Sequence, residues 1–406
     1  MDTLLDRFCR YVKVETTSDE NVQEYPSSPG QLVLGKMLVE ELRALNLIDV
    51  NQDENGQVMA TIPGNVAGAP TIAWLAHLDT SPEVSGKDVK PIIHRNYDGR
   101  EIVLPGDPSK IIRPEETTEL ADLVGKTLIT SDGTTLLGAD DKAGVAAIMT
   151  AADQLMSDPS LEHGPIRILF TVDEEIARGT DKVDVESVGA VCAYTLDAEG
   201  QGEIENETFS ADKAEVTITG INIHPGWAKN KMVNAVRLAA EFLVLLPKDM
   251  APETTEGREQ FIHPDVMSGN VSEVKIRMIL RSFETADLAV QAELLRHAAK
   301  TVMEANPRAE IKVDIEKQYR NMLEDLAREP RAVDLARQAF ENIGVESRFA
   351  SLRGGTDGAR LSECGLPTPN LSTGMHNFHS PLEFGCLEEM ETAVKVLVEL
   401  ARLWAK

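Results

Sequence analysis

The sequence is poor in cysteine and in positive charge. Its 406 residues include four cysteines, and none lies close to another: Cys9, Cys192, Cys364 and Cys386. This scatter argues against a disulfide framework and a cysteine-based zinc site, and it favours a reducing cytoplasm. Lys and Arg number 40 against 67 Asp and Glu, which gives a formal net charge of -27. We expect no nucleic-acid partner, because phosphate backbones bind basic surfaces.

Long apolar runs are absent as well. No segment approaches the ~20 consecutive apolar residues of a membrane span, so we expect no membrane partner. The first turns of the chain place Leu4, Leu5, Phe8 and Tyr11 at helical spacing among charged residues. This pattern predicts an amphipathic helix and lacks the uninterrupted apolar stretch of a signal peptide. We therefore predict a cytoplasmic protein.

Strand-like and helix-like segments alternate over the first half of the chain. Short apolar runs rich in β-branched residues predict strands at 58–62, 71–76, 166–172 and 190–196, and helical periodicity predicts helices at 30–46 and 142–156. Strands that alternate with helices are typical of an α/β domain. We predict a mixed, largely parallel sheet flanked by helices.

The pattern changes at about residue 209. Alternating segments predict strands at 209–223, 273–283 and 310–319, and helical periodicity predicts helices at 230–246 and 286–305. These elements make a smaller α+β domain, which we place at 209–321. It would be inserted into the first domain, whose two parts are residues 1–208 and 322–406.

Acidic and histidine side chains recur at strand ends and turns. The set consists of His77, Asp79, Asp140, Asp141, Glu174, Glu175, Asp197 and His379. In open parallel sheets, ligands bind beyond the carboxyl ends of the strands, so these side chains would converge in one cleft. Imidazole and carboxylate groups bind zinc, or a similar ion such as Mn²⁺ or Co²⁺. Helix caps and turns would explain any single Asp, but the recurring placement favours a shared site.

The spacing of these residues suggests separate roles. His77 and Asp79 lie two residues apart in extended chain, so the Asp79 carboxylate can orient the imidazole. Glu174 and Glu175 would face opposite sides, one as a ligand and the other as a general base, and spacing leaves open which is which. The G-A-D-D-K-A-G segment (138–144) leads into a helix, and an Asp at this helix start is either its cap or a bridge between two cations. The number of candidate ligands suggests a two-metal site, which generates hydroxide at neutral pH.

Two further motifs carry candidate substrate contacts. The R-G-G-T-D-G segment at 353–358 lacks the Lys-Ser/Thr of a phosphate loop. Its glycines predict a tight turn with positive φ, and Arg353 is a candidate to contact a substrate carbonyl or carboxylate. His224 begins a His-Pro-Gly turn in the inserted domain, which would direct an imidazole outward.

Together these motifs resemble a known family. H-L-D-T (77–80), L-L-G-A-D-D-K-A-G (136–144), D-E-E (173–175), H-P-G (224–226), R-G-G-T-D-G (353–358) and the late His379 are similar to those of the peptidase T group of tripeptide aminopeptidases. This group belongs to the di-zinc metallopeptidase family that includes carboxypeptidase G, aminoacylase and succinyl-diaminopimelate desuccinylase. The resemblance extends over nearly the whole chain.

The resemblance implies a role for each motif residue. Two Zn²⁺ ions per chain would be bridged by Asp140, with His77 and Asp197 at one ion and Glu175 and His379 at the other. Asp79 would orient His77, Glu174 would be the general base, His224 would stabilise the oxyanion, and Arg281 would bind a substrate carboxylate. The peptide bond between Asp140 and Asp141 would be cis.

The function implied is hydrolysis of the N-terminal residue from short peptides, mainly tripeptides, by a metal-bridging hydroxide. The inserted domain would act as a lid. The alternatives are a related di-zinc hydrolase of dipeptides or N-acyl amino acids, and a non-catalytic metal- or peptide-binding protein. A homodimer is required if His224 serves a neighbouring subunit, whereas a monomer suffices if it serves its own chain.

Overall fold

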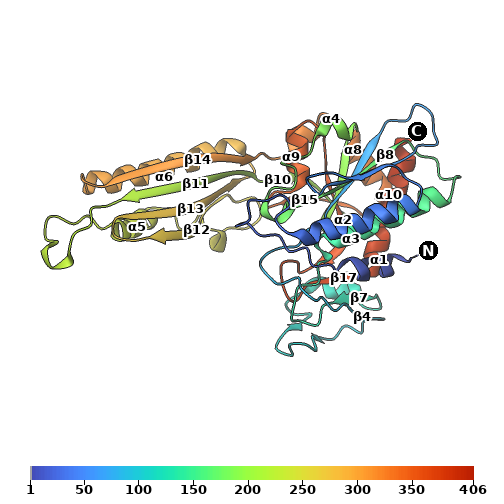
Figure 1. Cartoon of the computed structure of the whole chain (residues 1–406), viewed down its shortest axis with the longest axis horizontal. Helices are drawn as coiled ribbons and strands as arrows, with labels where there is room; N and C mark the ends of the chain where they lie inside the picture. Colours follow the sequence, from blue (N-terminus) through green and yellow to red (C-terminus); the bar gives the residue numbers. More distant parts are fainter. Residues whose placement is uncertain (1) are drawn as a thin grey trace. The chain divides into compact units, whose positions relative to one another are not determined.

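The computed structural model describes residues 2–406, which form two compact units (Figure 1). The first unit contains the chain up to Asn206, Met322–Ala350 and Thr356–Lys406, and the second contains Glu207–Asn321 and Ser351–Gly355. The segment Ser351–Gly355 was predicted in the first domain but packs with the second unit. The reason is a contact invisible in the sequence, because Arg353 donates hydrogen bonds to the carbonyl oxygens of Gly257 and Glu259.

The first unit contains a sheet with the strand order β1-β2-β8-β3-β9-β16-β17-β7-β4, beside which β10 and β15 pair. The strands are β1 (Ile48–Gln52), β2 (Val58–Ile62), β3 (Ile72–His77), β4 (Ile92–His94), β7 (Leu128–Thr130), β8 (Ile166–Thr171), β9 (Ala193–Glu199), β10 (Glu203–Thr208), β15 (Arg348–Leu352), β16 (Asn370–His376) and β17 (Phe384–Cys386). The central strands β8, β3, β9 and β16 are parallel, and the outer pairs are antiparallel. The predicted α/β class is confirmed.

Helices cover both faces of this sheet. One face packs against α1 (Leu4–Tyr11), α2 (Pro29–Ala44), α3 (Ala139–Ser157), α8 (Arg331–Asn342) and α10 (Leu387–Trp404), and the other against α4 (Val185–Val188) and α9 (Asp357–Glu363). Strand β3 shows the consequence, since Trp74 and Ala76 join the first core whereas Ala73 and Leu75 join the second. Burial on both faces explains why this strand reads as a continuous apolar run.

The predicted N-terminal helix is present as α1. Thr3 and Asp6 form a capping box at its start, and Phe8 and Tyr11 are buried. Arg7, also buried, donates a hydrogen bond from its guanidinium to Asp153 near the end of α3. Within residues 2–406, none of the helices combines the length and the apolar character that a membrane span requires.

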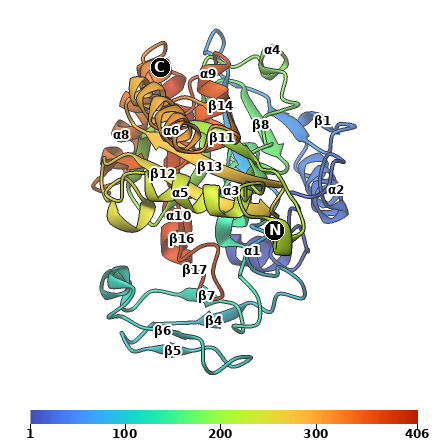
Figure 2. The same ribbon diagram turned by 90° about the vertical axis from the view of Figure 1, so that its left-hand side faces the viewer.

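One region of the first unit contains strands that the sequence pattern did not indicate. Strands β4 and β7 lie at one edge of the sheet, and β5 (Ile102–Val103) pairs with β6 (Ile111–Ile112) beside a small separate core (Figure 2). These strands have only two or three residues each. Periodicity cannot be recognised over so short a length.

The second unit is an antiparallel sheet of four strands with the order β12-β13-β11-β14. Its elements are β11 (Ser210–Thr219), α5 (Ala235–Val244), β12 (Phe261–Gly269), β13 (Glu273–Ser282), α6 (Thr285–Ala305) and β14 (Glu310–Tyr319). Strand β12 lies in a segment that reads as a polar loop. It is an edge strand with mostly exposed side chains, and its pairing with β13 is irregular after Pro264. Proline is tolerated at such edge positions.

Candidate metal centre and catalytic residues

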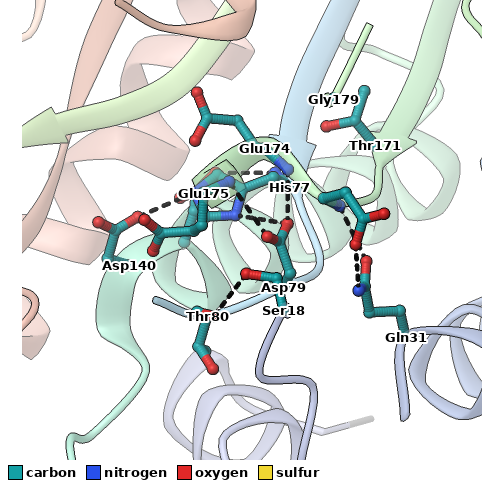
Figure 3. A network of polar contacts seen from close by, with 12 residues as sticks. Ser18, Gln31, His77, Asp79, Thr80, Asp140, Thr171, Glu174, Glu175 and Gly179 are labelled. Atoms are coloured by element: carbon teal, nitrogen blue, oxygen red, sulfur yellow. Dashed lines mark hydrogen bonds and ion pairs between the residues drawn. The ribbon is translucent and has the colours of Figure 1, made fainter. Parts of the chain in front are cut away.

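Four of the five candidate ligands lie in or shortly after the parallel strands of the first unit. His77 is the last residue of β3, Asp197 lies in β9, Glu175 follows β8, and His379 follows β16. Asp140 lies in the first turn of α3. Because the four strands are parallel and adjacent, their carboxyl ends bring these side chains together. Figure 3 shows part of this cluster.

Asp140 lies between two pairs of side chains. Its Oδ1 atom is 2.9 Å from Nε2 of His77, and its Oδ2 atom is 3.3 Å from Nε2 of His379. Asp197 Oδ1 lies 3.5 Å from the same His77 nitrogen, and Glu175 Oε2 lies 2.8 Å from the same His379 nitrogen. His77 and Asp197 therefore group at one oxygen of Asp140, and Glu175 and His379 group at the other.

Asp141 lies in the same cluster, but its two carboxylate oxygens accept backbone hydrogen bonds. A carboxylate oxygen of Asp141 lies within 4.8 Å of ligand atoms of His77 and Asp197. However, its Oδ2 accepts the backbone N–H of His77 and its Oδ1 accepts that of Gly144, both at 3.1 Å. These bonds join the end of β3 to the start of α3. The peptide bond between Asp140 and Asp141 is cis.

Asp79 connects the end of β3 to the turn that carries the two glutamates. Its carboxylate oxygens accept the backbone N–H groups of Glu174 at 3.0 Å and of Glu175 at 3.1 Å. Its Oδ1 is also 3.4 Å from Nδ1 of His77, although that nitrogen makes no hydrogen bond within the described chain. The contact of Asp79 with the glutamate turn was not predicted, because it joins segments that are almost a hundred residues apart.

Glu174 and Glu175 do not have the extended geometry predicted from the sequence. They begin a 3₁₀ turn (Glu174–Ile176) that follows Asp173, whose φ is 59°. The side chain of Glu175 is only 4% exposed and faces His379. The carboxylate of Glu174 points away from it (Figure 3) and makes no hydrogen bond or ion pair within residues 2–406. The turn thus places the carboxylate of Glu175 beside His379 and leaves the carboxylate of Glu174 without a partner in the described chain.

Asp173 holds this turn in place. Its buried carboxylate accepts hydrogen bonds from the backbone N–H of Ser27 at 2.8 Å, from the Ser27 hydroxyl at 2.6 Å and from the Gln31 amide at 2.7 Å. The left-handed conformation of a non-glycine residue is unfavourable and persists only where the surroundings impose it. Sequence reasoning assigned no role to Asp173, since its partners lie on α2 and the loop before it.

Burial and the two histidines shift the pKa values of the cluster in opposite directions. Burial raises the pKa of Glu175 to about 8 and that of Asp197 to about 6, and it raises the pKa of Glu174 well above its usual value. Burial would also raise the pKa of Asp140, but hydrogen bonds from His379 and His77 lower it instead. Buried carboxylates so close together need nearby positive charge in order to ionise.

The donor set fits divalent cations. Two imidazole nitrogens and three carboxylates are the ligands that zinc takes in proteins, and they also suit manganese and cobalt. Glu175 Oε1 is buried and accepts no hydrogen bond from residues 2–406, which is rare for a buried oxygen. A cation beside Glu175 would satisfy this oxygen and offset the acidic charge.

His224 and Arg281 lie in the second unit. His224 is exposed, and its Nδ1 accepts the backbone N–H of Gly226 at 3.1 Å. A neutral imidazole that accepts at Nδ1 carries its proton on Nε2, so this side chain presents a free donor. Arg281 lies over the ring of Tyr319 and donates a hydrogen bond to Gln318 Oε1 at 3.1 Å.

Arg353 differs from the prediction in its surroundings. Its guanidinium donates to the carbonyl oxygens of Gly257 and Glu259 and to the Thr255 hydroxyl, and it lies over the rings of Phe209 and Phe261. These contacts belong to the second unit and leave few of its N–H groups for a substrate.

The glycines of R-G-G-T-D-G have a different purpose from the one predicted. Neither Gly354 nor Gly355 has a positive φ. Instead, a Cβ atom at Gly355 would lie 2.3 Å from Tyr319 Cζ, and one at Gly358 would lie 2.6 Å from Asn370 Oδ1. Close packing therefore explains Gly355 and Gly358, whereas a Cβ atom at Gly354 would meet only an ordinary contact with Leu352 at 3.8 Å.

Comparison with known proteins identifies the family. The model of the peptidase family M20/M25/M40 matches residues 131–403. Peptidase T of Bacillus subtilis (strain 168) is 46% identical over 402 residues, which cover 99% of this chain and 98% of that protein. Peptidase T of Clostridium acetobutylicum is 45% identical over 407 residues. The matched region covers 100% of this chain and 100% of that protein.

Solved structures agree with this relation. Aminopeptidase PepT from Bacillus cereus has a TM-score of 0.77 at 25% identity, with 99% of this chain and 98% of that chain covered. A tripeptidase from Staphylococcus aureus has a TM-score of 0.76 at 22% identity, with the same coverage, and shares the fold. The predicted resemblance is confirmed, because the family model matches more than half of the chain and the sequence relatives span nearly all of it. The chain belongs to the peptidase family M20/M25/M40.

Proposed function

We propose that this chain is a di-zinc aminopeptidase that removes the N-terminal residue from short peptides, with tripeptides as its main substrates. The relatives named peptidase T support a peptidase, and the similar structures described as an aminopeptidase and a tripeptidase support this substrate class. The arrangement of the strand-end cluster supports metal-dependent chemistry. The observation that carries the proposal is the position of Asp140, whose two oxygens face two separate histidine–carboxylate pairs.

Five side chains would hold the two ions, which we take to be Zn²⁺, with Mn²⁺ or Co²⁺ as substitutes. The ligands would be His77 and Asp197 for one ion, Glu175 and His379 for the other, and Asp140 for both. Bound at these positions, the ions would polarise the scissile carbonyl group and acidify a water molecule. A protein described as a dinuclear metal binding peptidase of the M20 family shares the fold, with a TM-score of 0.64 at 17% identity over 98% of this chain and 97% of that chain.

Glu174 would carry the proton during hydrolysis. Its carboxylate is free of partners within residues 2–406, and Asp79 holds its backbone. Burial raises the pKa of Glu174, which makes the carboxylate a stronger base than one in water. It would take a proton from the attacking water and deliver it to the amine of the departing residue, so that one carboxyl group serves as base and then as acid.

Two residues of the second unit would act on the substrate. His224 would donate the proton-bearing Nε2 to the carbonyl oxygen as negative charge develops there, a role in which a fixed donor is effective. Arg281 would bind the carboxylate at the peptide's C-terminus, since a guanidinium pairs with a carboxylate through two hydrogen bonds. The contact of Arg353 with substrate stays a prediction. All four cysteines are free thiols, which supports a cytoplasmic location.

Metal removal combined with product analysis tests the proposal. The purified chain is treated with a chelator and then reloaded with Zn²⁺, and each form is incubated with a tripeptide, a dipeptide and an N-acetyl amino acid. We expect the reloaded form to bind two zinc ions per chain and to release the N-terminal residue of the tripeptide fastest. The chelated form should be inactive.

The other outcomes identify the alternatives. Faster cleavage of the dipeptide or of the N-acetyl amino acid would indicate a related hydrolase of the same family. Zinc binding without cleavage of any of the three would indicate a binding protein. Full activity in the chelated form would overturn the metal mechanism itself. The sedimentation behaviour of the active form would decide between a monomer and a homodimer.

A further inference from the structure

Glu383 is a buried carboxylate that contacts the metal-centre loop and to which the peptidase chemistry assigns no role. Its side chain is 1% exposed. Its Oε2 atom accepts the backbone N–H groups of Leu137 at 2.7 Å and of Gly138 at 2.8 Å, and its Oε1 atom accepts that of Asp140 at 3.0 Å. One carboxylate therefore accepts hydrogen bonds from three of the four backbone N–H groups between Leu137 and Asp140, the loop that carries the candidate ligand.

The loop needs such an acceptor because of its conformation. Gly138 has a left-handed backbone with φ 81°, and helix α3 begins directly after it. Backbone N–H groups that converge at a helix N-terminus favour an anion. In many proteins that anion is a ligand, whereas here it belongs to the chain itself.

The position of Glu383 joins the two halves of the candidate centre. It lies four residues after His379 and directly before Phe384, which is buried and paired with His376 and Thr130. The segment that carries His379 is thus fixed to the sheet at Phe384 and to the Asp140 loop at Glu383. In this arrangement His379 Nε2 lies 3.3 Å from Asp140 Oδ2.

We propose that Glu383 is a positioning residue that holds Asp140 and His379 at the separation required to bind a metal ion together. This inference rests on the proposed di-metal function. The three hydrogen bonds that Glu383 accepts require a carboxylate on a side chain of this length. A glutamine has one acceptor oxygen, and its amide would face a backbone N–H. An aspartate keeps the charge, but it is one methylene shorter and cannot reach all three N–H groups.

Zinc affinity of the full-length chain tests the proposal without reference to catalysis. Wild type, E383Q and E383D are compared by competition with a chromogenic zinc chelator, together with the melting temperature of each metal-free form. We expect both substitutions to lower zinc affinity about 10–100-fold, as removal of partners outside a ligand set does. At saturating zinc, kcat should fall more than KM changes.

D153N is the matched control. Asp153 is a buried carboxylate on the same helix as Asp140, and it accepts a hydrogen bond from Arg7 at 2.9 Å. It lies 13 positions further along the chain, near the other end of α3. We expect D153N to melt at a lower temperature but to bind zinc as wild type does.

Three results would overturn the proposal. If both Glu383 variants melt earlier but bind zinc like wild type, as D153N should, the residue is only structural. If E383D matches wild type and E383Q does not, negative charge matters and positioning does not. A wild-type chain that binds no zinc overturns both proposals. A wild type that binds zinc but cleaves no peptide overturns only the proposed function, because the affinity comparison still holds. If E383Q does not fold, E383D decides the question.

Discussion

Substitution of Glu174 by glutamine separates proton transfer from metal binding. The change preserves the size of the side chain and breaks no hydrogen bond or ion pair, because the carboxylate makes none within residues 2–406. The backbone N–H bonded to Asp79 is unaffected. Burial raises the pKa of Glu174, so ionising it costs free energy that the amide avoids. We therefore expect E174Q to be no less stable than wild type.

The expected loss is confined to turnover. A positioned general base contributes about 10²–10⁴-fold in rate. At 1.36 kcal/mol for each factor of ten, this corresponds to about 3–5 kcal/mol of the activation barrier. We predict that kcat for a tripeptide falls by this factor in E174Q, with zinc content equal to that of wild type. Amino-acid release is measured by chromatography, and zinc by elemental analysis of the same sample.

The neighbouring residue supplies the control. Glu175 carries the same side chain one position later, but its Oε2 lies 2.8 Å from His379 Nε2. The loss of a group outside a ligand set costs about 10–100-fold in metal affinity, and E175Q should lose at least that much. If E174Q keeps turnover within about tenfold of wild type, or if E174Q rather than E175Q loses zinc, the assigned roles are wrong.

The remaining predictions concern other parts of the chain. H224A should reduce kcat by about 10²–10³-fold, because that is the effect of removing one oxyanion donor. Its zinc content should not change, and an unaltered kcat would contradict the role of Nε2. R281A should raise KM for free tripeptides by about tenfold or more, because a charged hydrogen bond contributes about 1.5–3 kcal/mol. The KM for C-terminally amidated tripeptides should not change, and equal effects on both would exclude the carboxylate contact. Finally, Cys364 is exposed and should react rapidly with a thiol reagent in the native protein. Burial raises the pKa of Cys386 to about 12 and raises that of Cys192 further, so both should react only after unfolding; rapid labelling of either would contradict the described core.

The central sheet and the residues that gather at its edge can be recognised from the amino-acid pattern alone. Strand β3 is apolar at every position before His77, because helices cover both faces, and this continuous run can be recognised without a structure. The ends of such strands locate a ligand site in any parallel sheet. For this reason His77, Asp197 and the Glu174–Glu175 pair could be assigned to one cluster from their positions alone.

The surroundings of each of these side chains depend on contacts between segments that are far apart in the chain. Spacing could not distinguish Glu174 from Glu175, because the answer depends on a turn after Asp173 that Ser27 and Gln31 hold from a distant segment. Glu383 could not be recognised either, since its partners lie more than 240 residues earlier in the chain. Local periodicity reports which face of an element is buried. The partner of a buried polar group depends on the packing of distant segments, and no local pattern records it.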